Sequence, residues 1–296
     1  MKLVHDIHAS RDTSKHPVIS FEFYPPKSDE DLQILMDKTL PALTKLKPDF
    51  CSVTYGAGGS TRDKTLLITD RIQREHNLTA VHHLTCDNST QAEINSILDQ
   101  AQRSGIQNIL ALRGDPPAGT SEFKKTEGGF EFSKELVAFI HAKGGFSIGV
   151  AGFPEGHIAC KEGKVVDWDR LKQKIDAGAD YVITQLFFDN ADYYEFHNYL
   201  AGKLNVKIPI CPGIIPILSA QQIKRITRLC GARLPAILLS RLDALEGDDK
   251  AVAAFGIEYA TRQCEELLKF GVPALHFYTM NKVHSVQEIV TRLGLK

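Results

Sequence analysis

The sequence predicts a single (β/α)8 barrel that spans residues 1–296. Three observations predict this fold: eight apolar runs rich in β-branched and aromatic residues, helical spacing between those runs, and a length that suits one α/β barrel. Strands that alternate with helices form a parallel sheet covered by helices, and eight such strands can close into a barrel.

The predicted strands cover residues 18–24, 50–55, 80–85, 108–112, 146–153, 181–188, 208–215 and 274–279. Helical periodicity places Leu32, Leu35, Met36 and Leu43 on one face of a helix, and Ile94, Ile97, Leu98 and Ala101 on one face of another. Two sequences, residues 90–93 and 285–288, fit the capping box that begins a helix. Helices are expected to end at Gly105, Gly178 and Gly271, because glycine readily takes the left-handed conformation.

The rival fold is an open, doubly wound sheet with a dinucleotide site. Its glycine-rich fingerprint is approached by GAGGST at residues 56–61, where Thr61 replaces the last glycine. Because even a complete match is weak alone, the regular succession of eight units favours the barrel.

Two segments interrupt the βα rhythm. Residues 116–131 form a long polar stretch rich in glycine and proline directly after the fourth strand. Such a stretch is typical either of a functional lid or of a disordered surface insertion, and its composition does not separate the two. Residues 234–249 are expected to be an extra excursion before the last helical layer.

Composition excludes several classes of protein. The net charge of −1 provides no polybasic surface for nucleic acid or membrane, and no apolar run approaches a membrane span. The opening sequence MKLVHDIHAS lacks the apolar core of a signal peptide. The six cysteines are scattered without a C-x-x-C pair, which favours reduced thiols in a cytoplasmic protein over a metal site or a disulfide framework.

Strand alternation locates polar groups inside the barrel, and active sites of barrels lie at the carboxyl ends of the strands. On the first strand, Phe21 and Phe23 are expected to face the helices, and Ser20 and Glu22 to face the interior. Burial raises the pKa of an unpaired carboxyl group, which would suit a general acid. A structural ion pair inside the barrel is an equally good interpretation of Glu22 at this point.

Other strands also carry polar residues near the same end. The predicted sets are Ser52 and Thr54; either His82 or His83; Ala111, Arg113 and Asp115; Tyr181, Ile183, Gln185 and Phe187; and His276 and Tyr278. The pair Arg113 and Asp115 suits either a salt bridge or contact with a phosphate or heterocycle, and the amide of Gln185 suits the edge of a ring. The sequence has no H-E-x-x-H, G-x-S-x-G or P-loop motif, so metal hydrolysis and serine catalysis lack support.

These motifs as a set resemble the bacterial methylenetetrahydrofolate reductases. The resemblance covers residues 18–285 and includes FEFYPPK at 21–27, SVTYGA at 52–57, HLTC at 83–86, LRGD at 112–115, PEGH at 154–157, TQLFFD at 184–189, PGIIP at 212–216 and HFYT at 276–279. It implies a barrel that carries FAD. It also implies a ping-pong reaction in which NADH or NADPH reduces the flavin, which then reduces 5,10-methylenetetrahydrofolate to 5-methyltetrahydrofolate for methionine synthesis.

The resemblance also implies roles for particular residues. Glu22 matches the general acid that protonates a folate nitrogen as the five-membered ring opens, and Asp115 matches a residue that contacts the pterin and tunes the flavin. Gln185 matches a contact shared by nicotinamide and folate, and Gln222, Tyr278 and Lys282 match further substrate contacts. The matches to the cofactor sites are Thr54, Tyr55, Ala57, His83, Arg113, Gly114, Asp115, Ser133, Phe153, His157, Cys160, Asp167, Arg170 and Lys174, of which Thr54 would contact the nicotinamide.

This chain departs from the family pattern at several of these positions. Phe153 stands where tyrosine is common, Cys160 where alanine is usual, and Lys282 where arginine is frequent, which removes a bidentate fork. The stretch of residues 160–166 is one residue longer than the pattern, which affects the matches of Asp167 and Arg170. Ile226 occupies a helix position where an aromatic ring can stack on a ligand, so nicotinamide preference stays open.

Two other functions compete with the reductase. One is another FAD-dependent barrel oxidoreductase similar to proline dehydrogenase, and the other is a non-catalytic subunit that binds flavin or folate. The set of Glu22, Asp115 and Gln185 favours the reductase. The resemblance further predicts a homo-oligomer that acts on a small molecule and not on nucleic acid or membrane. Because the sequence ends without a long C-terminal regulatory region, we expect no control by S-adenosylmethionine.

Overall fold

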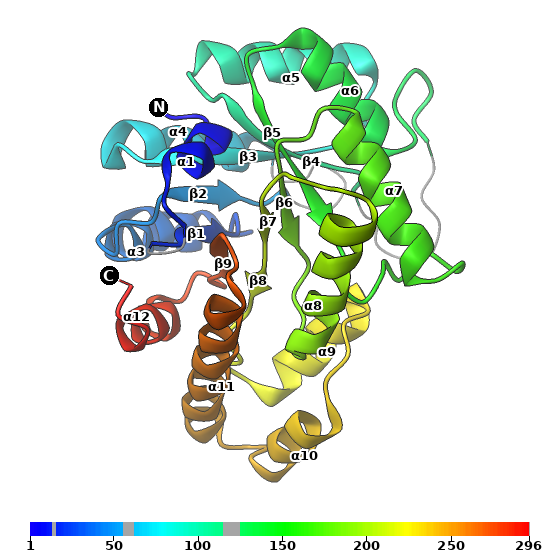
Figure 1. Ribbon diagram of the computed structural model, residues 1–296. Coiled ribbons are helices and arrows are strands. Elements are labelled where there is room, and N and C mark those ends of the chain that lie inside the picture. Colours follow the sequence, from blue (N-terminus) through cyan, green and yellow to red (C-terminus); the bar gives the residue numbers. More distant parts are fainter. Residues whose placement is uncertain (14–15, 56–61, 115–124, 296) are drawn as a thin grey trace.

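The computed structural model describes residues 1–13, 16–55, 62–114 and 125–295. These residues form a barrel of parallel strands wrapped by helices (Figure 1). The described strands are β1 (Val18–Phe23), β2 (Phe50–Val53), β3 (Thr79–Thr85), β4 (Asn108–Leu112), β5 (Ser147–Gly152), β6 (Tyr181–Thr184), β7 (Ile210–Cys211), β8 (Gly213–Ile214) and β9 (Ala274–Tyr278). They pair in the order β7-β6-β5-β4-β3-β2-β1-β9-β8, which confirms the predicted barrel and excludes the doubly wound sheet.

The barrel closes through its seventh strand, which is broken at Pro212. The first half, β7, pairs with β6, and the second half, β8, pairs with β9. Proline has no N–H to donate to a ladder, so the strand changes partners at this residue, while the Pro212 carbonyl accepts from His276 N at 3.0 Å. Gly213 N then donates to the Thr184 hydroxyl at 2.9 Å. The prediction of one continuous strand over residues 208–215 was therefore too simple.

The barrel interior has an apolar lower half. Val18, Phe50, Val81, Leu110 and Tyr181 form its centre, one from each of five strands, and all are buried. Tyr181 occupies the space beside Gly149 of β5, where an added Cβ would lie 2.5 Å from the tyrosine ring. A large side chain facing a glycine fills the barrel without a void, as close packing requires.

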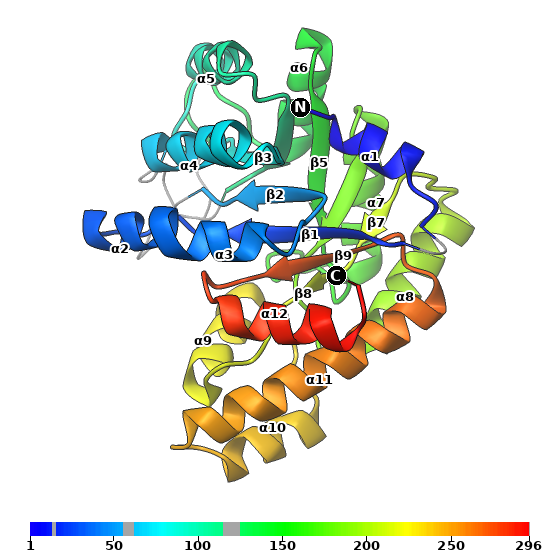
Figure 2. The ribbon, with the colours of Figure 1, turned by 90° about the vertical axis from the view of Figure 1, so that its left-hand side faces the viewer.

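Helix α1 (Val4–Ser10) covers the amino end of the barrel. Figure 2 shows α1 on the side opposite to the one toward which β1, β2 and β9 point. Val4 and Ile7 of α1 join the interior apolar cluster. Asn108 at the start of β4 accepts from Val4 N at 2.8 Å and anchors the helix there. The amino end of the barrel is thus packed with side chains, and its polar groups lie at the carboxyl end.

The other described helices surround the barrel. They are α2 (Asp29–Ile34), the π-helical turn η1 (Leu35–Thr39), α3 (Leu40–Thr44), α4 (Arg62–His76), α5 (Gln91–Arg103), α6 (Ser133–Lys143), α7 (Lys164–Asp176), α8 (Asn190–Asn198), the π-helical turn η3 (Tyr199–Lys203), α9 (Ala220–Cys230), α10 (Ala236–Ala244), α11 (Asp249–Phe270) and α12 (Val283–Arg292). Within the described residues, no helix is long and apolar enough to cross a membrane. All six cysteines are free, as expected.

Helix faces follow the predicted periodicity, with one irregularity. Ile94, Ile97, Leu98 and Ala101 of α5 are all buried. Leu35, Met36 and Leu43 are also buried together, but α2 and α3 are separated by the turn η1 and do not form one α-helix. Pro41 lacks the N–H that would continue the α-helical ladder, which accounts for a break near this point.

The helix boundaries confirm one capping box and contradict the other. Thr90 and Glu93 bond reciprocally at the start of α5. Ser285, in contrast, lies inside α12, which begins at Val283 with Lys282 as its N-cap, so the predicted box at residues 285–288 was wrong. The preceding Met280 and Asn281 have left-handed backbones that turn the chain into the helix three residues earlier than predicted. Gly105, Gly178 and Gly271 have positive φ at helix ends, as predicted.

The excursion at residues 234–249 contains the extra helix α10. Leu238 and Leu242 of this helix pack into a second apolar cluster with Leu186, Phe188 and other residues of α9 and α11. This cluster lies on the loops that follow the carboxyl ends of β6 and β8. The excursion therefore thickens the barrel on the side of α9 (Figure 1).

Burial of His8 predicts an acid-sensitive amino-terminal helix. Burial, aided by Arg11, lowers the pKa of His8 to about 4, and its Nε2 lies 3.7 Å from Cys211 Sγ. Because the unfolded chain binds this proton near pH 6.5, stability present above that pH is lost as the pH falls toward 4. We expect His8 to account for about 2 kcal/mol of lost stability between pH 7 and pH 5.

Urea unfolding of the wild type and of His8→Gln at the two pH values measures this contribution. Glutamine stays neutral throughout, so the variant should lose about 2 kcal/mol less than the wild type between the two conditions. Identical losses in the two proteins would show that His8 does not titrate on unfolding.

Candidate active site

A buried carboxylate lies at the centre of the barrel mouth. Glu22, at the end of β1, is 4% exposed. Its Oε2 accepts from the Ser52 hydroxyl at 3.3 Å and lies 3.2 Å from His276 Nε2 and 3.5 Å from His83 Nε2. Phe21 and Phe23 pack on the helix side, so the alternation predicted for β1 is confirmed. Of the two adjacent histidines on β3, His83 is the one that faces inward.

A chain of hydrogen bonds links this carboxylate to β9. Because a carboxylate oxygen only accepts, His276 Nε2 donates to Glu22, and Nδ1 forms a hydrogen bond with the Ser20 hydroxyl at 2.7 Å. The parallel register makes this possible, since Ser20 is directly paired with His276. The imidazole stacks on Phe50 below it, with ring centroids 6.4 Å apart. Ser20, His276 and Glu22 therefore form a preorganised hydrogen-bonded row.

The pKa of Glu22 differs from the sequence-based expectation. Burial by itself raises the pKa, but the hydrogen bond from His276, the neighbouring His83 and the Tyr24 hydroxyl together bring it below its ordinary value. Glu22 is therefore ionised near neutrality when no ligand is bound. The expected rise in pKa was wrong for this state because the carboxylate is paired.

Burial is the largest influence on the pKa of His83 and lowers it to about 4. His83 is therefore a neutral imidazole near pH 7, and its contact with Glu22 is not a full ion pair. Hydrogen bonds from His276, Ser52 and Tyr24 hold the ionised carboxylate in place.

The loop after β9 fixes the backbone on both sides of Glu22. The Thr279 hydroxyl donates to the Glu22 carbonyl at 2.6 Å. Asn281 makes two hydrogen bonds to the backbone of Tyr24: its side chain accepts from Tyr24 N at 3.0 Å and donates to Tyr24 O at 2.7 Å. Met280 and Asn281 adopt positive φ to form this loop. Glu22 is thus held by its backbone as well as by its side chain.

Tyr278 lies beside the carboxylate, in register with it on β9. Its hydroxyl donates to the Thr184 carbonyl at 2.6 Å and its ring stands edge-on to His276. Burial and the nearby charge of Glu22 raise the pKa of Tyr278 well above its ordinary value. Tyr278 therefore remains a protonated hydroxyl next to Glu22.

A second polar group lies beyond the ends of β4 and β5. Lys174 of α7 donates to the Ala151 carbonyl at 2.6 Å, and its pKa is affected by the charges of Asp167 and Arg113. Burial, with a contribution from Arg113, lowers the pKa of Lys174 to about 8. Two neighbouring cations, Arg113 and Lys174, suit an anionic group such as a phosphate.

The loop after β5 carries the remaining members of this group. Asp167 accepts from His157 N at 3.1 Å, and Phe153 stands edge-on to the His157 ring. Burial raises the pKa of Asp167, although Lys174 and the hydrogen bond from His157 oppose that rise.

Cys160 and Arg170 lie at the outer edge of the same loop. Arg170 donates to Cys160 Sγ at 3.2 Å and pairs with Glu162. The structure thus brings Phe153, His157, Cys160, Asp167, Arg170 and Lys174 together in one region.

Strand six follows the predicted alternation up to its end, since Tyr181 and Ile183 both belong to the interior. Strand four also alternates, but Ala111 belongs to the helix-facing cluster and Leu110 and Leu112 to the interior, so Ala111 does not face inward. Phe187 also packs on the helix side, because β6 ends at Thr184 and the chain turns. Gln185 N donates to Gly152 O at 2.7 Å, and its own Oε1 accepts from Leu186 N.

The remaining predicted residues lie around the mouth at various depths. Thr54 and Tyr55 are half-buried after β2, Gly114 follows β4 with φ of +91°, and Ser133 is half-buried at the start of α6. Gln222 is exposed in the first turn of α9, and Lys282 is exposed at the start of α12. Neither of the last two is in contact with the Glu22 cluster. Ala57 and Asp115 lie outside the described residues.

Sequence reasoning missed several partners of Glu22. His276 and Ser20 were placed inside the barrel, but their contact with each other was not predicted, and Tyr24 was not considered. The signal that identifies them is the parallel register between β1 and β9, which pairs Ser20 with His276 and Glu22 with Tyr278. Within the described residues, no cluster of three or more acidic, histidine or cysteine side chains is arranged to hold a metal ion.

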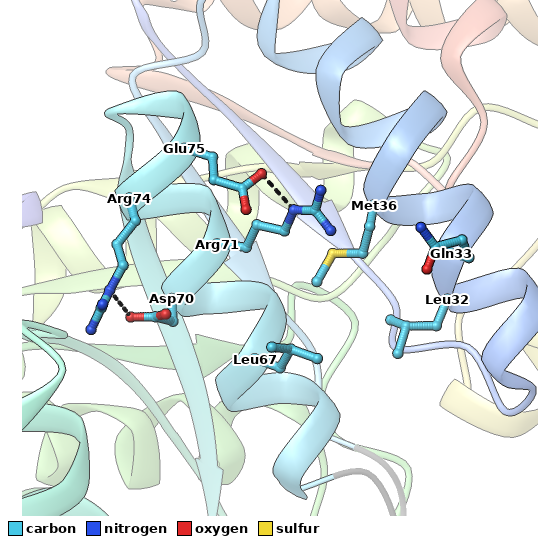
Figure 3. Close-up of a pocket in the computed structure, with 8 residues that line it drawn as sticks. All are labelled: Leu32, Gln33, Met36, Leu67, Asp70, Arg71, Arg74 and Glu75. Carbon is cyan, nitrogen blue, oxygen red and sulfur yellow. Dashed lines mark hydrogen bonds and ion pairs between the residues drawn. The ribbon is translucent and has the colours of Figure 1, made fainter.

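A groove outside the barrel is a separate feature. It has a volume of about 240 Å³ and lies between α2, η1 and α4 (Figure 3). Its charged side chains are paired within it: Arg71 with Glu75, and Arg74 with Asp70, each at 2.6 Å. We assign no site to this groove.

Comparison with known proteins identifies relatives of this chain. The family model for methylenetetrahydrofolate reductase matches residues 6–294. Methylenetetrahydrofolate reductase (NADH) 1 of Arabidopsis thaliana is 40% identical over 286 residues, which cover 93% of this chain and 48% of that protein. The 5,10-methylenetetrahydrofolate reductase of Escherichia coli strain K12 is 34% identical over 278 residues, which cover 94% of this chain and 91% of that protein. The chain thus spans about half the length of the plant relative and most of the bacterial one.

Among solved structures, an uncharacterized protein from Clostridium thermocellum that binds two copies of 5-methyl-5,6,7,8-tetrahydrofolic acid is similar in fold. Its TM-score is 0.67 at 17% identity, with 98% of this chain and 97% of that chain covered. Oxaloacetate acetylhydrolase shares the fold more distantly, with a TM-score of 0.55 at 11% identity over 97% of this chain and 84% of that chain. The match of the family model over nearly the whole sequence shows that this chain belongs to the methylenetetrahydrofolate reductase family.

Proposed function

We propose that this protein is an FAD-dependent reductase that converts 5,10-methylenetetrahydrofolate to 5-methyltetrahydrofolate with NADH or NADPH in a ping-pong scheme. The observation that carries the proposal is the carboxylate of Glu22, buried at the barrel mouth and hydrogen-bonded to His276. A family member with a preorganised acid at this place is equipped to deliver a proton to a bound substrate.

The residues beyond β4 and β5 fit the flavin that the family resemblance implies. The neighbouring cations Arg113 and Lys174 suit the diphosphate of FAD, and His157 and Phe153 provide an aromatic wall. When bound, FAD supplies the transfer of hydride between the two substrates. The chain's own residues would bind and orient the cofactor and hold the proton that the reaction consumes.

In this proposal, Glu22 donates a proton to a folate nitrogen as the five-membered ring opens. The ligand-free carboxylate is ionised, but a bound substrate excludes water from the mouth, and desolvation raises the pKa of a carboxyl group. The proton then moves from Glu22 to the nitrogen as the carbon–nitrogen bond breaks, and the hydride arrives at the resulting cationic carbon.

His276 and Ser20 would hold the acid in place. His276 Nε2 lies 3.2 Å from Glu22, and Nδ1 lies 2.7 Å from the Ser20 hydroxyl, so this row fixes the Glu22 carboxylate while the proton that it donates is replaced from solvent between turnovers. Tyr278 stays protonated. Its hydroxyl would donate to the substrate only after it gives up its hydrogen bond to the Thr184 carbonyl.

The other substrate contacts are proposed from the family resemblance. Asp115 would stabilise the cationic folate electrostatically, and Gln185 would meet a ring edge after its amide leaves Leu186 N. Gln222 and Lys282, both exposed, would contact the outer part of the folate, where a lysine supplies charge without a fork. A homo-oligomer and a single unit over residues 1–296 stay predictions.

The two half-reactions test the proposed activity directly. The purified protein should be yellow, should bleach anaerobically when NADH or NADPH is added, and should regain its colour with 5,10-methylenetetrahydrofolate. Following the flavin absorbance in each step measures both halves. A folded, flavin-loaded sample that is bleached by nicotinamide but not reoxidised by the folate would contradict the proposal, and proline as an alternative reductant tests the rival oxidoreductase.

Substitution of the proposed acid should separate the half-reactions. Glu22→Gln keeps the size and the hydrogen-bonding capacity of the side chain but cannot donate a proton as an acid. We expect flavin reduction to stay within about twofold of the wild type, and flavin reoxidation by folate to fall by at least about 100-fold. Stopped-flow absorbance gives both rates.

Glu288→Gln is the matched control, because Glu288 is an exposed carboxylate on α12 that pairs with Arg292. It should leave both half-reactions unchanged. Equal losses in the two half-reactions of Glu22→Gln would make Glu22 a structural residue and not the acid.

A further inference from the structure

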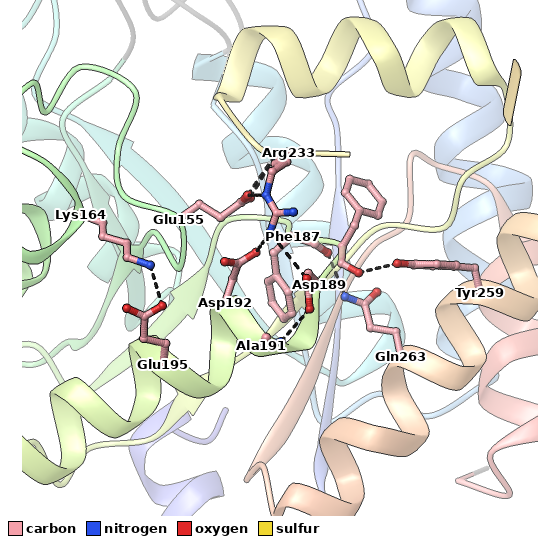
Figure 4. Close-up of polar contacts among 11 residues, drawn as sticks. Glu155, Lys164, Phe187, Asp189, Ala191, Asp192, Glu195, Arg233, Tyr259 and Gln263 are labelled. Carbon is pink, nitrogen blue, oxygen red and sulfur yellow. Dashed lines mark hydrogen bonds and ion pairs between the residues drawn. The ribbon is translucent and has the colours of Figure 1, made fainter. Parts of the chain in front are cut away.

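Arg233 connects three segments at the carboxyl end of the barrel. It lies in the short connection between α9 and α10 (Figure 4). Its backbone N–H is 3.1 Å from both carboxylate oxygens of Glu155, in the loop after β5. Its guanidinium donates to Asp192 at 2.9 Å and lies 3.6 Å from Asp189, both at the start of α8.

Each of these three segments carries residues proposed to bind ligand. The loop with Glu155 also contains Phe153 and His157, and the segment that leads to Asp189 begins at Gln185. The helix that precedes Arg233, α9, contains Gln222. Arg233 itself is not among the proposed contacts, so it links three parts of the site from outside.

Arg233 offsets the repulsion among three carboxylates that surround it. Glu155, Asp189 and Asp192 place three carboxylates around one guanidinium, and the side chains of Glu155 and Asp192 are each only 16% exposed. Burial and the two aspartates raise the pKa of Glu155. Without the arginine, three acidic groups in a partly desolvated space would repel one another and separate the loops that carry them.

The opposite side of the β6–α8 segment is held independently. Gln263 of α11 donates to the Phe187 carbonyl at 2.9 Å, and Tyr259 donates to the Phe188 carbonyl at 2.5 Å (Figure 4). The β6–α8 segment thus contacts α11 on one side and Arg233 on the other. Of Tyr259, Gln263 and Arg233, only Arg233 also contacts Glu155 in the loop after β5.

The end of α9 also reaches the other side of the mouth. Cys230, three residues before Arg233, packs against the same apolar cluster as Tyr278 and influences the pKa of both Tyr24 and Tyr278. The stretch from Cys230 to Arg233 therefore spans from the ends of β1 and β9 to the loops after β5 and β6.

We propose that Arg233 is a positioning residue that holds α9, the loop after β5 and the segment after β6 in the arrangement that receives the folate. This inference rests on the proposed function for its kinetic effect, although the link itself is independent of it. The folate is expected to contact Gln222 of α9 as well as Gln185. Folate binding should therefore depend on Arg233 more strongly than flavin reduction by nicotinamide does.

The test compares Arg233→Gln with the wild type in the two half-reactions. KM for 5,10-methylenetetrahydrofolate should rise about tenfold, and the rate of flavin reduction by nicotinamide should stay within about twofold. Arg262→Gln, which removes an exposed arginine paired with Glu258 on α11, is the matched control and should change neither value.

Two further variants separate charge compensation from a general loss of structure. Arg233→Lys restores the charge and should recover most of the lost affinity. In the double variant Arg233→Gln/Asp192→Asn, removal of one repelling carboxylate should lower KM relative to Arg233→Gln alone. Independent structural damage predicts instead that the second substitution leaves KM unchanged or raises it, which would overturn the proposal.

Hydrogen exchange provides a readout that does not depend on activity. In Arg233→Gln, backbone amides of residues 153–163 and 185–192 should exchange faster together, whereas those of α5 should not change. If the wild type shows no folate turnover, the proposed function fails, but the exchange result still tests the link. If the wild type turns over and Arg233→Gln matches it in both KM and exchange, the inference about Arg233 is wrong.

Discussion

The burial of one carboxylate inside the barrel mouth is the constraint on which the rest of the site depends. An ionised group removed from water is strongly destabilised unless hydrogen bonds replace its hydration. Glu22 obtains these bonds from Ser52 and His276, one on each neighbouring strand, and its carbonyl is held by Thr279. The residues around Glu22 must therefore be hydrogen-bond donors. The same bonds fix the direction of its side chain at the carboxyl end of the barrel.

The barrel provides these bonds because its interior is divided into layers. The lower layer is apolar, closed by α1, and Phe50 in this layer supports the His276 ring. The polar layer above it begins at the next inward-facing position of β1, β2, β3 and β9, which is Ser20, Ser52, His83 and His276, as the pleat requires. The break at Pro212 lets the seventh strand contact both β6 and β9, so the ring closes without disturbing the register that pairs Ser20 with His276.

Sequence patterns predicted the barrel and the inward direction of Glu22, because both follow from local periodicity. They failed in two ways: Phe187 turns outward because β6 has already ended, and Ala111, within β4, lies on the helix side of its strand. They also could not show that His276 bonds Glu22, since that contact depends on the register between strands 254 residues apart. Arg233 was missed for the same reason, because its three partners come from two other loops.

The lowered pKa of Glu22 and its proposed role as an acid are compatible because the two describe different states. In the ligand-free mouth, donors surround the carboxylate and favour its charge. In the proposed function, a bound folate adds desolvation, which favours a protonated Glu22, and a basic nitrogen, which then accepts the proton. Glu22 lies on a strand, whereas the loop after β5 and the start of α8 carry Glu155, Asp189 and Asp192, whose like charges surround Arg233. In the proposed function, the strand holds the proton donor and Arg233 holds the segments that bind the substrate.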